Sequence, residues 1–292
     1  MRHQAAGPRT LGVRLRGVFD LVRPQNCLAS ALATLLGVHL GDGSDGAGPV
    51  RVAASMLVVC LILAASYVVN DLRDADADVL GNPGRAIPSG RVTRREAVAL
   101  WWALGAGGCL VAFAFGEADL AVMAVACLAA GVVYSVRLKG TVLVGNAFVG
   151  LMAATPVLYG SLAGGSPTAS TWFAALIMFL FIFADEVLKA IGDREADGAA
   201  GLRTVGTRLG LVQGLLVFRT ITLGFVAAAL LPLVAGRAGV IYGAGVLLGA
   251  VGPALWNVGA LARRPEAAAV RVALRLDKLV WFTGLWALWF LG

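Results

Sequence analysis

Aspartate residues gather in two short segments, each of which follows an apolar stretch of the chain. In the first segment, Asp71, Asp74 and Asp78 have the spacing i, i+3 and i+7. On a helix these three carboxylates share one face, and Asp76 lies off that face, where we expect it to be exposed. Hard divalent cations prefer carboxylate oxygens as ligands. The spacing therefore predicts a cation site on one face of a helix.

The second segment places Asp193 and Asp197 one helical turn apart. Two further steps of four residues back along the chain reach Lys189 and Asp185, which predicts one polar stripe on a helix. An ion pair between Asp185 and Lys189 at i, i+4 is the simplest interpretation of that end of the stripe. A direct role of Asp185 or Glu186 in substrate chemistry is the alternative. We expect the two carboxylate faces to lie opposite each other.

The composition of the 292-residue chain is that of an all-α integral membrane protein. Hydrophobic residues make up 59% of it and charged residues 14%, and the mean hydropathy is +0.83. Soluble domains average about 25% charged residues. Apolar runs long enough to cross a bilayer predict nine transmembrane helices, near residues 26–40, 51–70, 97–116, 119–135, 142–163, 171–190, 210–233, 239–262 and 273–291.

The basic residues predict the orientation of these spans. With nine spans, 21 of the 24 Lys and Arg fall on one side, within residues 1–25, 71–96, 136–141, 189–209 and 263–278. The positive-inside rule places this side in the cytoplasm, together with the N-terminus and both aspartate segments, and the C-terminus outside. We attribute the net charge of +7 to topology and anionic membrane lipids, and we expect no nucleic-acid partner.

The first 25 residues are predicted to form a cytoplasmic tail that ends in an interfacial helix. Leu11, Leu15, Val18 and Val22 recur at helical spacing among arginines, a pattern typical of a helix lying on a membrane surface. No apolar signal-peptide segment precedes residue 25, so we expect this part to stay attached. Residues 26–292 are predicted to form a single transmembrane domain. The four cysteines lack metal-ligand spacing, so we expect buried thiols.

A diphosphate explains why two carboxylate segments would be built into a membrane bundle. Mg²⁺ is commonly bound by one or two carboxylates together with phosphate oxygens, so ions at both segments could bridge to one diphosphate. Arg85, Lys139, Lys189 and Arg203 lie on the same predicted side and could bind further phosphate oxygens. An apolar tail on that diphosphate would account for a water-free helical cavity.

Four motifs in order resemble those of the UbiA superfamily of intramembrane prenyltransferases. They are NDxxDxxxD at Asn70–Asp78, an NxxRPxxSG-like loop at Asn82–Gly90, YSxxLK…GN at Tyr134–Lys139 and Gly145–Asn146, and a KDxxDxExD-like element at Lys189–Asp197. Ala86 replaces the proline of the second motif, and Ala190 replaces an aspartate of the fourth. The resemblance covers about residues 20–290.

The resemblance implies a nine-helix bundle around a central cavity that opens to the cytoplasm, and Mg²⁺-dependent ionisation of an allylic isoprenyl diphosphate. It implies that Mg²⁺ is held by Asp71, Asp74, Asp78, Asp193 and Asp197, with Asn70 assisting. The implied substrate-binding residues are Asn70, Arg85, Tyr134 and Lys189, and Lys139 joins the five aspartates as a catalytic residue. Asn26, at the start of the first predicted span, and Glu186, an ionisable residue within a predicted span, are further substrate-binding candidates.

The acceptor of the isoprenyl group stays open at this stage. Residues Arg23–Cys27 read RPQNC, which resembles the start of the digeranylgeranylglyceryl phosphate synthase-like branch of that family and favours a glycerol phosphate lipid. Other lipophilic or aromatic acceptors are alternatives. A terpene cyclase, which closes the isoprenyl cation on itself, is another. Aromatic side chains could then line its cavity, namely Trp101, Trp102, Phe148, Phe173, Phe179, Phe181 and Phe183.

A transporter is the rival from a different class, because acidic residues in membrane spans also mark cation pathways. The carboxylates, however, cluster at one predicted end of the spans, and no acidic chain continues to the other side. This placement favours an enzyme.

Overall fold

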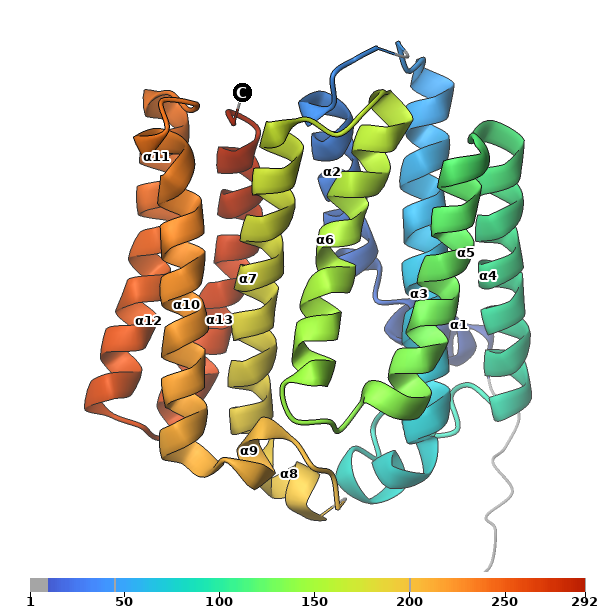
Figure 1. Cartoon of the computed structure of the whole chain (residues 1–292). Helices are drawn as coiled ribbons and strands as arrows, with labels where there is room; N and C mark the ends of the chain where they lie inside the picture. Colours follow the sequence, from blue (N-terminus) through green and yellow to red (C-terminus); the bar gives the residue numbers. More distant parts are fainter. Residues whose placement is uncertain (1–9, 45, 200, 292) are drawn as a thin grey trace, which may run out of the picture. The chain divides into compact units, whose positions relative to one another are not determined.

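The computed structural model describes residues 10–44, 46–199 and 201–291, and the predicted tail up to residue 9 lies outside this range (Figure 1). Within it the regular structure is helical and contains no strand, as the sequence predicts. The elements are α1 (Leu11–Val22), α2 (Pro24–Leu40), α3 (Pro49–Gly81), α4 (Arg94–Phe115), α5 (Ala118–Val133), η1 (Tyr134–Leu138), α6 (Val144–Gly164), α7 (Ala169–Gly192), α8 (Arg194–Ala199), α9 (Val205–Arg208), α10 (Gly210–Val234), α11 (Val240–Val246), η2 (Leu247–Val251), α12 (Gly252–Arg263) and α13 (Ala267–Leu288).

Six helical stretches of the described chain are long and apolar enough to cross a membrane. They are Pro49–Val79, Arg94–Phe115, Ala118–Leu138, Val144–Gly164, Gly210–Val234 and Val240–Arg263. The other three predicted spans coincide with α2, α7 and α13, which are helices but fall outside this group of six. The helical character of all nine segments is thus confirmed, and the count of nine membrane crossings stays a prediction.

Contacts along the chain divide it into two compact units. The first unit comprises residues 1–28 and 57–137, and the second comprises residues 29–56 and 138–292. In the first unit α4 packs along α5 (Figure 1). Glycines allow close contacts there, because the Cβ positions of Gly108 and Gly131 would lie 2.8 Å from Ile62 Cδ1 and 2.4 Å from Ser66 Oγ of α3.

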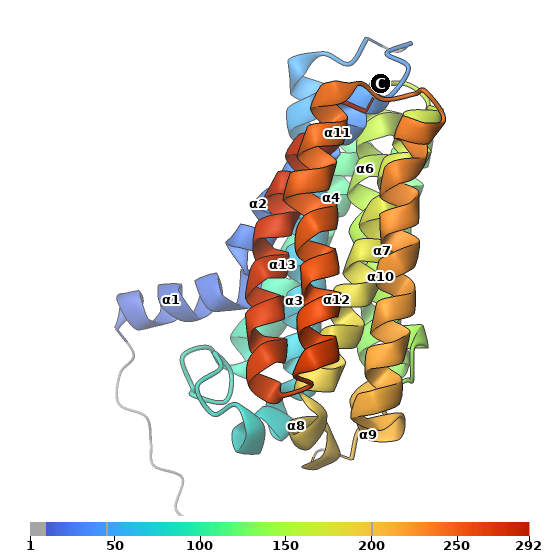
Figure 2. The same cartoon turned by 90° about the vertical axis from the view of Figure 1, so that its left-hand side faces the viewer.

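Helix α1 lies across the long helices of the first unit (Figure 2). Its Leu21 side chain is fully buried in a small apolar core. Leu11, Leu15 and Phe19 are exposed and follow one another at intervals of four residues. The predicted stripe therefore shifts, because Val18 packs against the core and Phe19 joins the exposed face. An interfacial position of this face stays a prediction.

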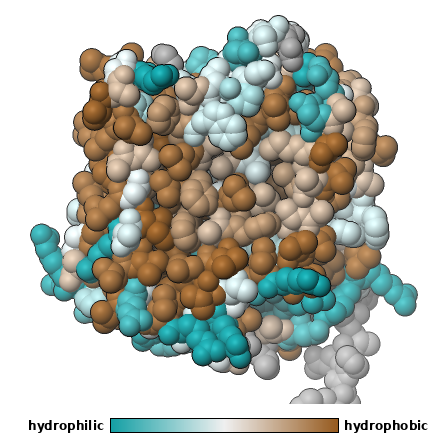
Figure 3. All heavy atoms as spheres, in the orientation of Figure 1, coloured by the Kyte–Doolittle hydropathy of each residue, from teal (hydrophilic) through white to brown (hydrophobic). Residues whose placement is uncertain are grey.

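In the second unit, α7 packs between α6 and α10 and also contacts α13 (Figure 1). Its apolar core is shared by α7, α10, the stretch from α11 to α12, and α13. In both units, apolar side chains cover much of the middle of the helices on the face shown, and hydrophilic ones gather toward their ends (Figure 3). Such a distribution suits helices that are embedded in a membrane.

Helices α2 and α6 of the second unit approach each other at glycines, Gly37 on α2 and Gly160 on α6. A Cβ atom at Gly37 would lie 2.0 Å from the carbonyl oxygen of Val157, and one at Gly160 would lie 1.9 Å from that of Thr34. No side chain fits into such gaps, so only glycine permits this backbone contact. The high glycine content of the chain predicts close helix packing, and these contacts confirm it.

Candidate active site

Helix α3 carries the first aspartate cluster, which we define as Asp71, Asp74 and Asp78, on a single face. The helix continues to Gly81, so the three residues keep the helical spacing that their sequence predicts. Asp71 and Asp78 are each only 7% exposed. Asp76 is exposed and pairs with Arg94 at 2.5 Å, as expected for a residue off the shared face.

The guanidinium group of Arg85 draws the three carboxylates of this cluster together. Arg85 Nη1 donates to Asp71 Oδ1 at 3.3 Å and to Asp78 Oδ2 at 3.1 Å, and it lies 3.9 Å from Asp74 Oδ2. The loop after α3 brings it there, because the Asn82 N–H bonds to the Asp78 carbonyl and the Arg85 N–H bonds to the Asn82 carbonyl. Three carboxylates thus converge on one positive charge.

A second arginine, Arg23, binds the same cluster from the end of α1. Its Nη2 donates to Asp71 Oδ1 at 2.7 Å, and its guanidinium lies 4.6 Å from the centre of the Tyr67 ring. Asn26 Nδ2 donates to the Tyr67 hydroxyl at 2.9 Å. Sequence reasoning missed both Arg23 and Tyr67 as members of the site. A signal was present for Tyr67, which precedes Asp71 by one helical turn.

Polar contacts join α1, which precedes Arg23, to the segment after α3, which carries Arg85. Arg91 in this loop forms an ion pair with Asp20 of α1 and donates to the Gly84 carbonyl at 2.7 Å. Arg14 of α1 donates to Glu96 at 2.6 Å. Helix α1 and the loop therefore form one support for the two guanidinium groups that bind the cluster.

Asn70 contributes an oxygen that suits a cation. Its Nδ2 donates to Asp74 Oδ2 at 3.1 Å, whereas its buried Oδ1 has no hydrogen-bond partner in the described parts of the chain. A buried acceptor without a donor is costly unless something satisfies it. The donor set of one amide and three carboxylate oxygens fits Mg²⁺. No three His, Cys, Asp or Glu side chains of the described residues are arranged as a finished metal site.

The second aspartate cluster, Asp193 and Asp197, lies where α7 gives way to α8. Helix α7 ends at Gly192, and Asp193 has the non-helical angles φ −91° and ψ 6°. The predicted stripe is therefore interrupted at Asp193. The spacing of one turn nevertheless survives, because the Asp193 N–H bonds to the Lys189 carbonyl at 2.9 Å and the Asp197 N–H bonds to the Asp193 carbonyl at 2.8 Å. Asp193 is exposed and Asp197 is half-buried.

Burial raises the pKa of the Asp197 carboxyl above its usual value, and a hydrogen bond from Thr204 and the nearby charge of Lys139 partly offset this effect. Lys139 and Asp197 therefore lie within electrostatic reach of each other in the second unit. Chain segments next to them touch, since a Cβ atom at Gly140 would lie 3.3 Å from Leu202 Cδ2. The proximity of Lys139 to Asp197 supports the prediction that Lys139 belongs to the site.

The segment after Asp197 is held against α7 by α9. A Cβ atom at Gly206 would lie 2.1 Å from the carbonyl oxygen of Ala190, so the backbones of α9 and α7 are in direct contact. Val205 beside it is fully buried. This contact fixes the far end of the segment that follows α8, the helix that carries Asp197.

Lys189 pairs with both acidic residues of the preceding turn. Its Nζ lies 2.6 Å from Asp185 Oδ2 and 2.8 Å from Glu186 Oε1. The predicted ion pair between Asp185 and Lys189 is thus confirmed. Asn146 of α6 donates to the Glu186 carbonyl at 3.0 Å and ties α6 to this turn.

Tyr134 and Arg203 are two further residues that the sequence predicts near the substrate. Tyr134 begins η1, a π-helical turn of the kind that is frequent at functional sites, and its side chain is half-buried. Arg203 is exposed in the loop before α9. Their roles toward substrate stay predictions.

Polar residues of α12 and α13 were missed by the sequence reasoning. Asp277 and Asn257 are buried, and Asn257 Nδ2 donates to Asp277 Oδ1 at 2.9 Å. Asp277 lies within electrostatic reach of Asp185. The signal was available, since an acidic residue within a predicted span is a functional candidate by default.

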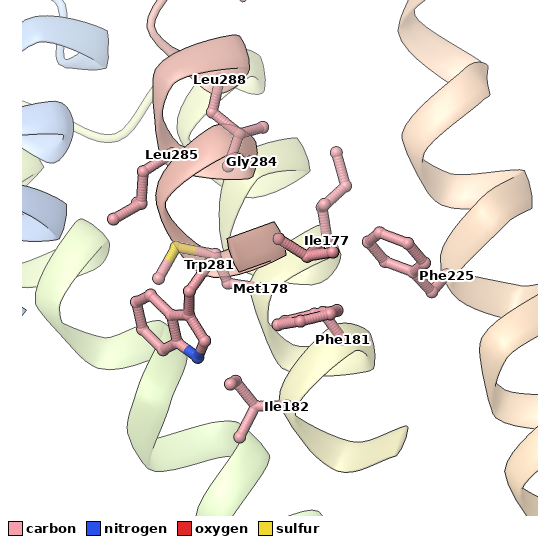
Figure 4. A pocket seen from close by; sticks show the side chains of 10 residues that line it. Ile177, Met178, Phe181, Ile182, Phe225, Trp281, Gly284, Leu285 and Leu288 are labelled. Carbon is pink, nitrogen blue, oxygen red and sulfur yellow. The ribbon is translucent and has the colours of Figure 1, made fainter. Parts of the chain in front are cut away.

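An apolar cavity of about 30 Å³ lies between α7, α10 and α13 in the second unit (Figure 4). Phe181, Phe225 and Trp281 contribute to its wall. Phe181 belongs to the aromatic residues proposed to line a cavity, whereas Trp102 is 62% exposed. Phe179 and Phe183 pack against each other with ring centres 5.8 Å apart.

Comparison with known proteins places this arrangement among prenyltransferases. The model of the UbiA prenyltransferase family matches residues 30–281. A digeranylgeranylglyceryl phosphate synthase of Korarchaeum cryptofilum is 33% identical over 231 residues, which cover 78% of this chain and 80% of the relative. One of Halobacterium salinarum is 36% identical over 226 residues, covering 76% and 79%.

Solved structures show the same fold. One that concerns digeranylgeranylglyceryl phosphate synthase in membranes superposes with a TM-score of 0.76 at 20% identity, covering 94% of this chain and 97% of that one. A UbiA homologue from Archaeoglobus fulgidus bound to GPP and Mg²⁺ superposes with a TM-score of 0.70 at 19% identity, covering 93% and 99%.

Proposed function

This chain belongs to the UbiA prenyltransferase family, and from that premise we propose that it transfers an isoprenyl group from an allylic isoprenyl diphosphate to the hydroxyl group of a glycerol phosphate lipid. The observation that carries the proposal is the convergence of Asp71, Asp74 and Asp78 on one cationic group at the end of a long apolar helix. That charge and that place suit a metal-bound diphosphate whose tail is apolar.

The residues that would hold Mg²⁺ are oxygen donors from both clusters: Asn70, Asp71, Asp74, Asp78, Asp193 and Asp197. When bound there, Mg²⁺ would offset the charge of the diphosphate and make it a better leaving group. Arg85 is 38% exposed, so its guanidinium can reach phosphate oxygens while remaining beside the carboxylates. Lys139 and Lys189 supply further positive charge, and Asn26, Tyr134 and Glu186 border the substrate.

The reaction breaks the bond between the allylic carbon and the diphosphate oxygen, and both electrons leave with the diphosphate. The acceptor hydroxyl oxygen then forms the new bond to that carbon, and its proton passes to the carboxylate of Glu186. The carbocation must be kept from water, and an apolar helical surrounding provides this protection. Glu186, already paired with Lys189 at 2.8 Å, is the proposed group that orients the acceptor hydroxyl.

Two observations favour a glycerol phosphate acceptor over an aromatic one. The curated relatives are named digeranylgeranylglyceryl phosphate synthases, a name that describes a glyceryl phosphate with two isoprenoid chains. The RPQNC segment also resembles the start of the digeranylgeranylglyceryl phosphate synthase-like branch. Its Arg23 donates to Asp71, and its Asn26 donates to Tyr67. The same relatives favour transfer over cyclisation, because a synthase of that product needs an acceptor.

Product analysis by mass spectrometry tests the proposal. Purified protein in detergent with Mg²⁺ is given geranyl, farnesyl or geranylgeranyl diphosphate, with and without a prenylated glycerol phosphate or an aromatic acceptor. The expected product has the mass of the glycerol phosphate acceptor plus one prenyl group. An aromatic adduct would change the acceptor class, and a hydrocarbon formed without acceptor would show a cyclase.

The placement of the protein in a membrane with its site and N-terminus in the cytoplasm and its C-terminus outside is part of this proposal. Cysteine-labelling of single-cysteine variants near residues 95 and 237 in intact cells tests it. Cation flux in liposomes without any isoprenyl diphosphate would instead support a transporter.

A further inference from the structure

A buried polar cluster lies inside the second unit and contains none of the aspartates that we assign to Mg²⁺. We define the core cluster as Asp185 of α7, Asn257 of α12 and Asp277 of α13, which line a cavity of about 10 Å³ together with Thr222 of α10. Asn257 is 1% exposed, Asp277 6% and Asp185 7%. Apolar side chains complete the wall, among them Phe181 and Phe225, which also line the cavity of Figure 4.

The charges of this cluster do not balance if every carboxyl is ionised. Lys189 already pairs with Asp185 and Glu186. Asp277 would add a third negative charge within reach of Asp185. Lys278 also acts on Asp185, but it belongs to an exposed position of α13. Like charges in a desolvated interior repel strongly, so one group takes up a proton or a cation is bound.

The orientation of the Asn257 amide bears on the choice between a proton and a cation. Its Nδ2 donates to Asp277 Oδ1 at 2.9 Å and to the Ala273 carbonyl at 3.4 Å. A carbonyl oxygen only accepts, so this contact fixes the amide with its nitrogen toward α13. Both N–H groups are then in use. The Asn257 Oδ1 atom is buried and lacks a hydrogen-bond partner among the residues that the structure describes.

We propose that Asp277 binds a proton and, as a neutral carboxylic acid, forms a two-bond pair with the amide of Asn257. The amide N–H donates to one carboxyl oxygen, and the carboxyl O–H donates to Asn257 Oδ1, which satisfies the orphaned acceptor. The negative charge of Asp185 is then left to Lys189. Asp277 is a positioning residue in this arrangement, because it acts on its neighbours Asp185 and Lys189 and has no assigned contact with substrate.

The proposal predicts different thermal stabilities for two substitutions in the core cluster. Asp277→Asn keeps two hydrogen bonds with Asn257, so its unfolding midpoint is expected within about 2 °C of the wild type. Asn257→Leu leaves the carboxyl of Asp277 without a partner, and a loss of more than about 4 °C is expected. An Asp277→Asn protein that unfolds as early as Asn257→Leu would overturn the proposal, because an anion or a bound cation would then be required.

Infrared spectroscopy in D₂O measures the proton directly, through the C=O stretch of a protonated carboxylic acid, which shifts on deuteration. We expect this band in the wild type and in Asp185→Asn, and its loss in Asp277→Asn. A band that disappears in Asp185→Asn instead, or no band in the wild type, contradicts the assignment. Neither measurement uses donor or acceptor, so its result is independent of whether the proposed prenyl transfer is correct.

The consequence for Lys189 rests on the proposed function. With a neutral Asp277, Asp277→Asn is expected to change the KM for the isoprenyl diphosphate by less than about twofold. Asp185→Asn releases the Lys189 ammonium from one partner and is expected to change that KM by about tenfold, which is the effect of 1.4 kcal/mol. Equal KM values for these two variants would contradict the positioning role.

Discussion

The two aspartate clusters have the same chemistry and are built in different ways. The first lies on one uninterrupted helix, is mostly buried, and is bound by two guanidinium groups. The second lies across a helix end, where Asp193 is exposed and the spacing is kept by two backbone hydrogen bonds. The first cluster is therefore held by a continuous helix, and two positive charges offset part of its three negative charges. The second depends on a turn and on the loop that follows it.

The loss of a carboxylate is the most direct way to compare the clusters, and it has the largest expected effect. Asp71→Asn should lower kcat for diphosphate release by about 10²–10³-fold, because Asp71 is the residue that both arginines bind and its charge would be missing in the transition state. Asp193→Asn should lower kcat less, since this exposed carboxylate is replaced more easily by water. Release of diphosphate from geranylgeranyl diphosphate measures both.

Asp76→Asn is the matched control, since Asp76 lies in the same segment and pairs with Arg94 off the shared face. Its activity should equal that of the wild type. A loss as large as that of Asp71→Asn would mean that any change of charge in this helix end disrupts the enzyme, and the assignment of the face would be wrong.

Arg85 sharpens the comparison, because its guanidinium donates to two carboxylates of the first cluster. Arg85→Gln removes a cation that competes for Asp71 and Asp78, so the Mg²⁺ concentration for half-maximal activity should fall several-fold. It also removes a phosphate ligand, so the KM for the isoprenyl diphosphate should rise about tenfold. Steady-state kinetics with Mg²⁺ and diphosphate varied separately detect the two opposite shifts.

Arg94→Gln serves as the control, because its guanidinium binds the exposed Asp76 at 2.5 Å. Exposed ion pairs contribute little, so neither constant should move. If Arg85→Gln raised both constants together, Arg85 would support the metal site and would not compete with it.

The difference between the clusters also explains what the sequence could predict. Spacings within one helix depend only on helical geometry, so the shared face of Asp71, Asp74 and Asp78 and the exposed Asp76 followed directly from the chain. The pair of Asp185 with Lys189 is local for the same reason. The interruption at Asp193 was missed, because Gly192 and the docking of the next segment end the helix there.

Contacts between distant segments were not accessible from one sequence. Arg23 meets Asp71 across 48 residues, and Asn257 meets Asp277 across 20. Both depend on how the helices are rotated against one another. The near-backbone contacts at Gly37 and Gly206 have the same origin, since the glycine content predicts close packing in general but does not identify the partner helices.

A substitution at Gly206 tests whether the second cluster depends on the segment that follows Asp197. Gly206→Ala places a methyl group 2.1 Å from the Ala190 carbonyl, so α9 must move away from α7 and carry the loop with it. A kcat about tenfold lower is expected, since misplacement of a catalytic group by about 1 Å can cost up to about 10²-fold. Gly198→Ala in the same segment is the control, because its methyl group meets only Thr207 Cγ2 at 3.9 Å. Equal activity of the two variants would show that Asp197 does not need this support.

The smallest expected effect concerns Asp42, which joins the loop after α2 to the loop after α6 in the second unit. Hydrogen bonds from the Ser166 N–H at 2.9 Å and from the Ser44 hydroxyl at 2.7 Å lower the pKa of the Asp42 carboxyl below its usual value. A lowered pKa in the folded state means that the ionised group adds stability above the ordinary carboxyl pKa. That stability is lost as the pH falls through the folded pKa.

Asp42→Asn should therefore reduce the thermal unfolding midpoint slightly at neutral pH and make its decline on acidification shallower than in the wild type. The amide oxygen can still accept the bond from Ser166, so the loops stay joined and the difference should nearly vanish at acidic pH. Thermal unfolding in detergent at several pH values measures it. A constant offset between the two proteins down to acidic pH would mean that the charge of Asp42 adds nothing, and that geometry alone joins these loops.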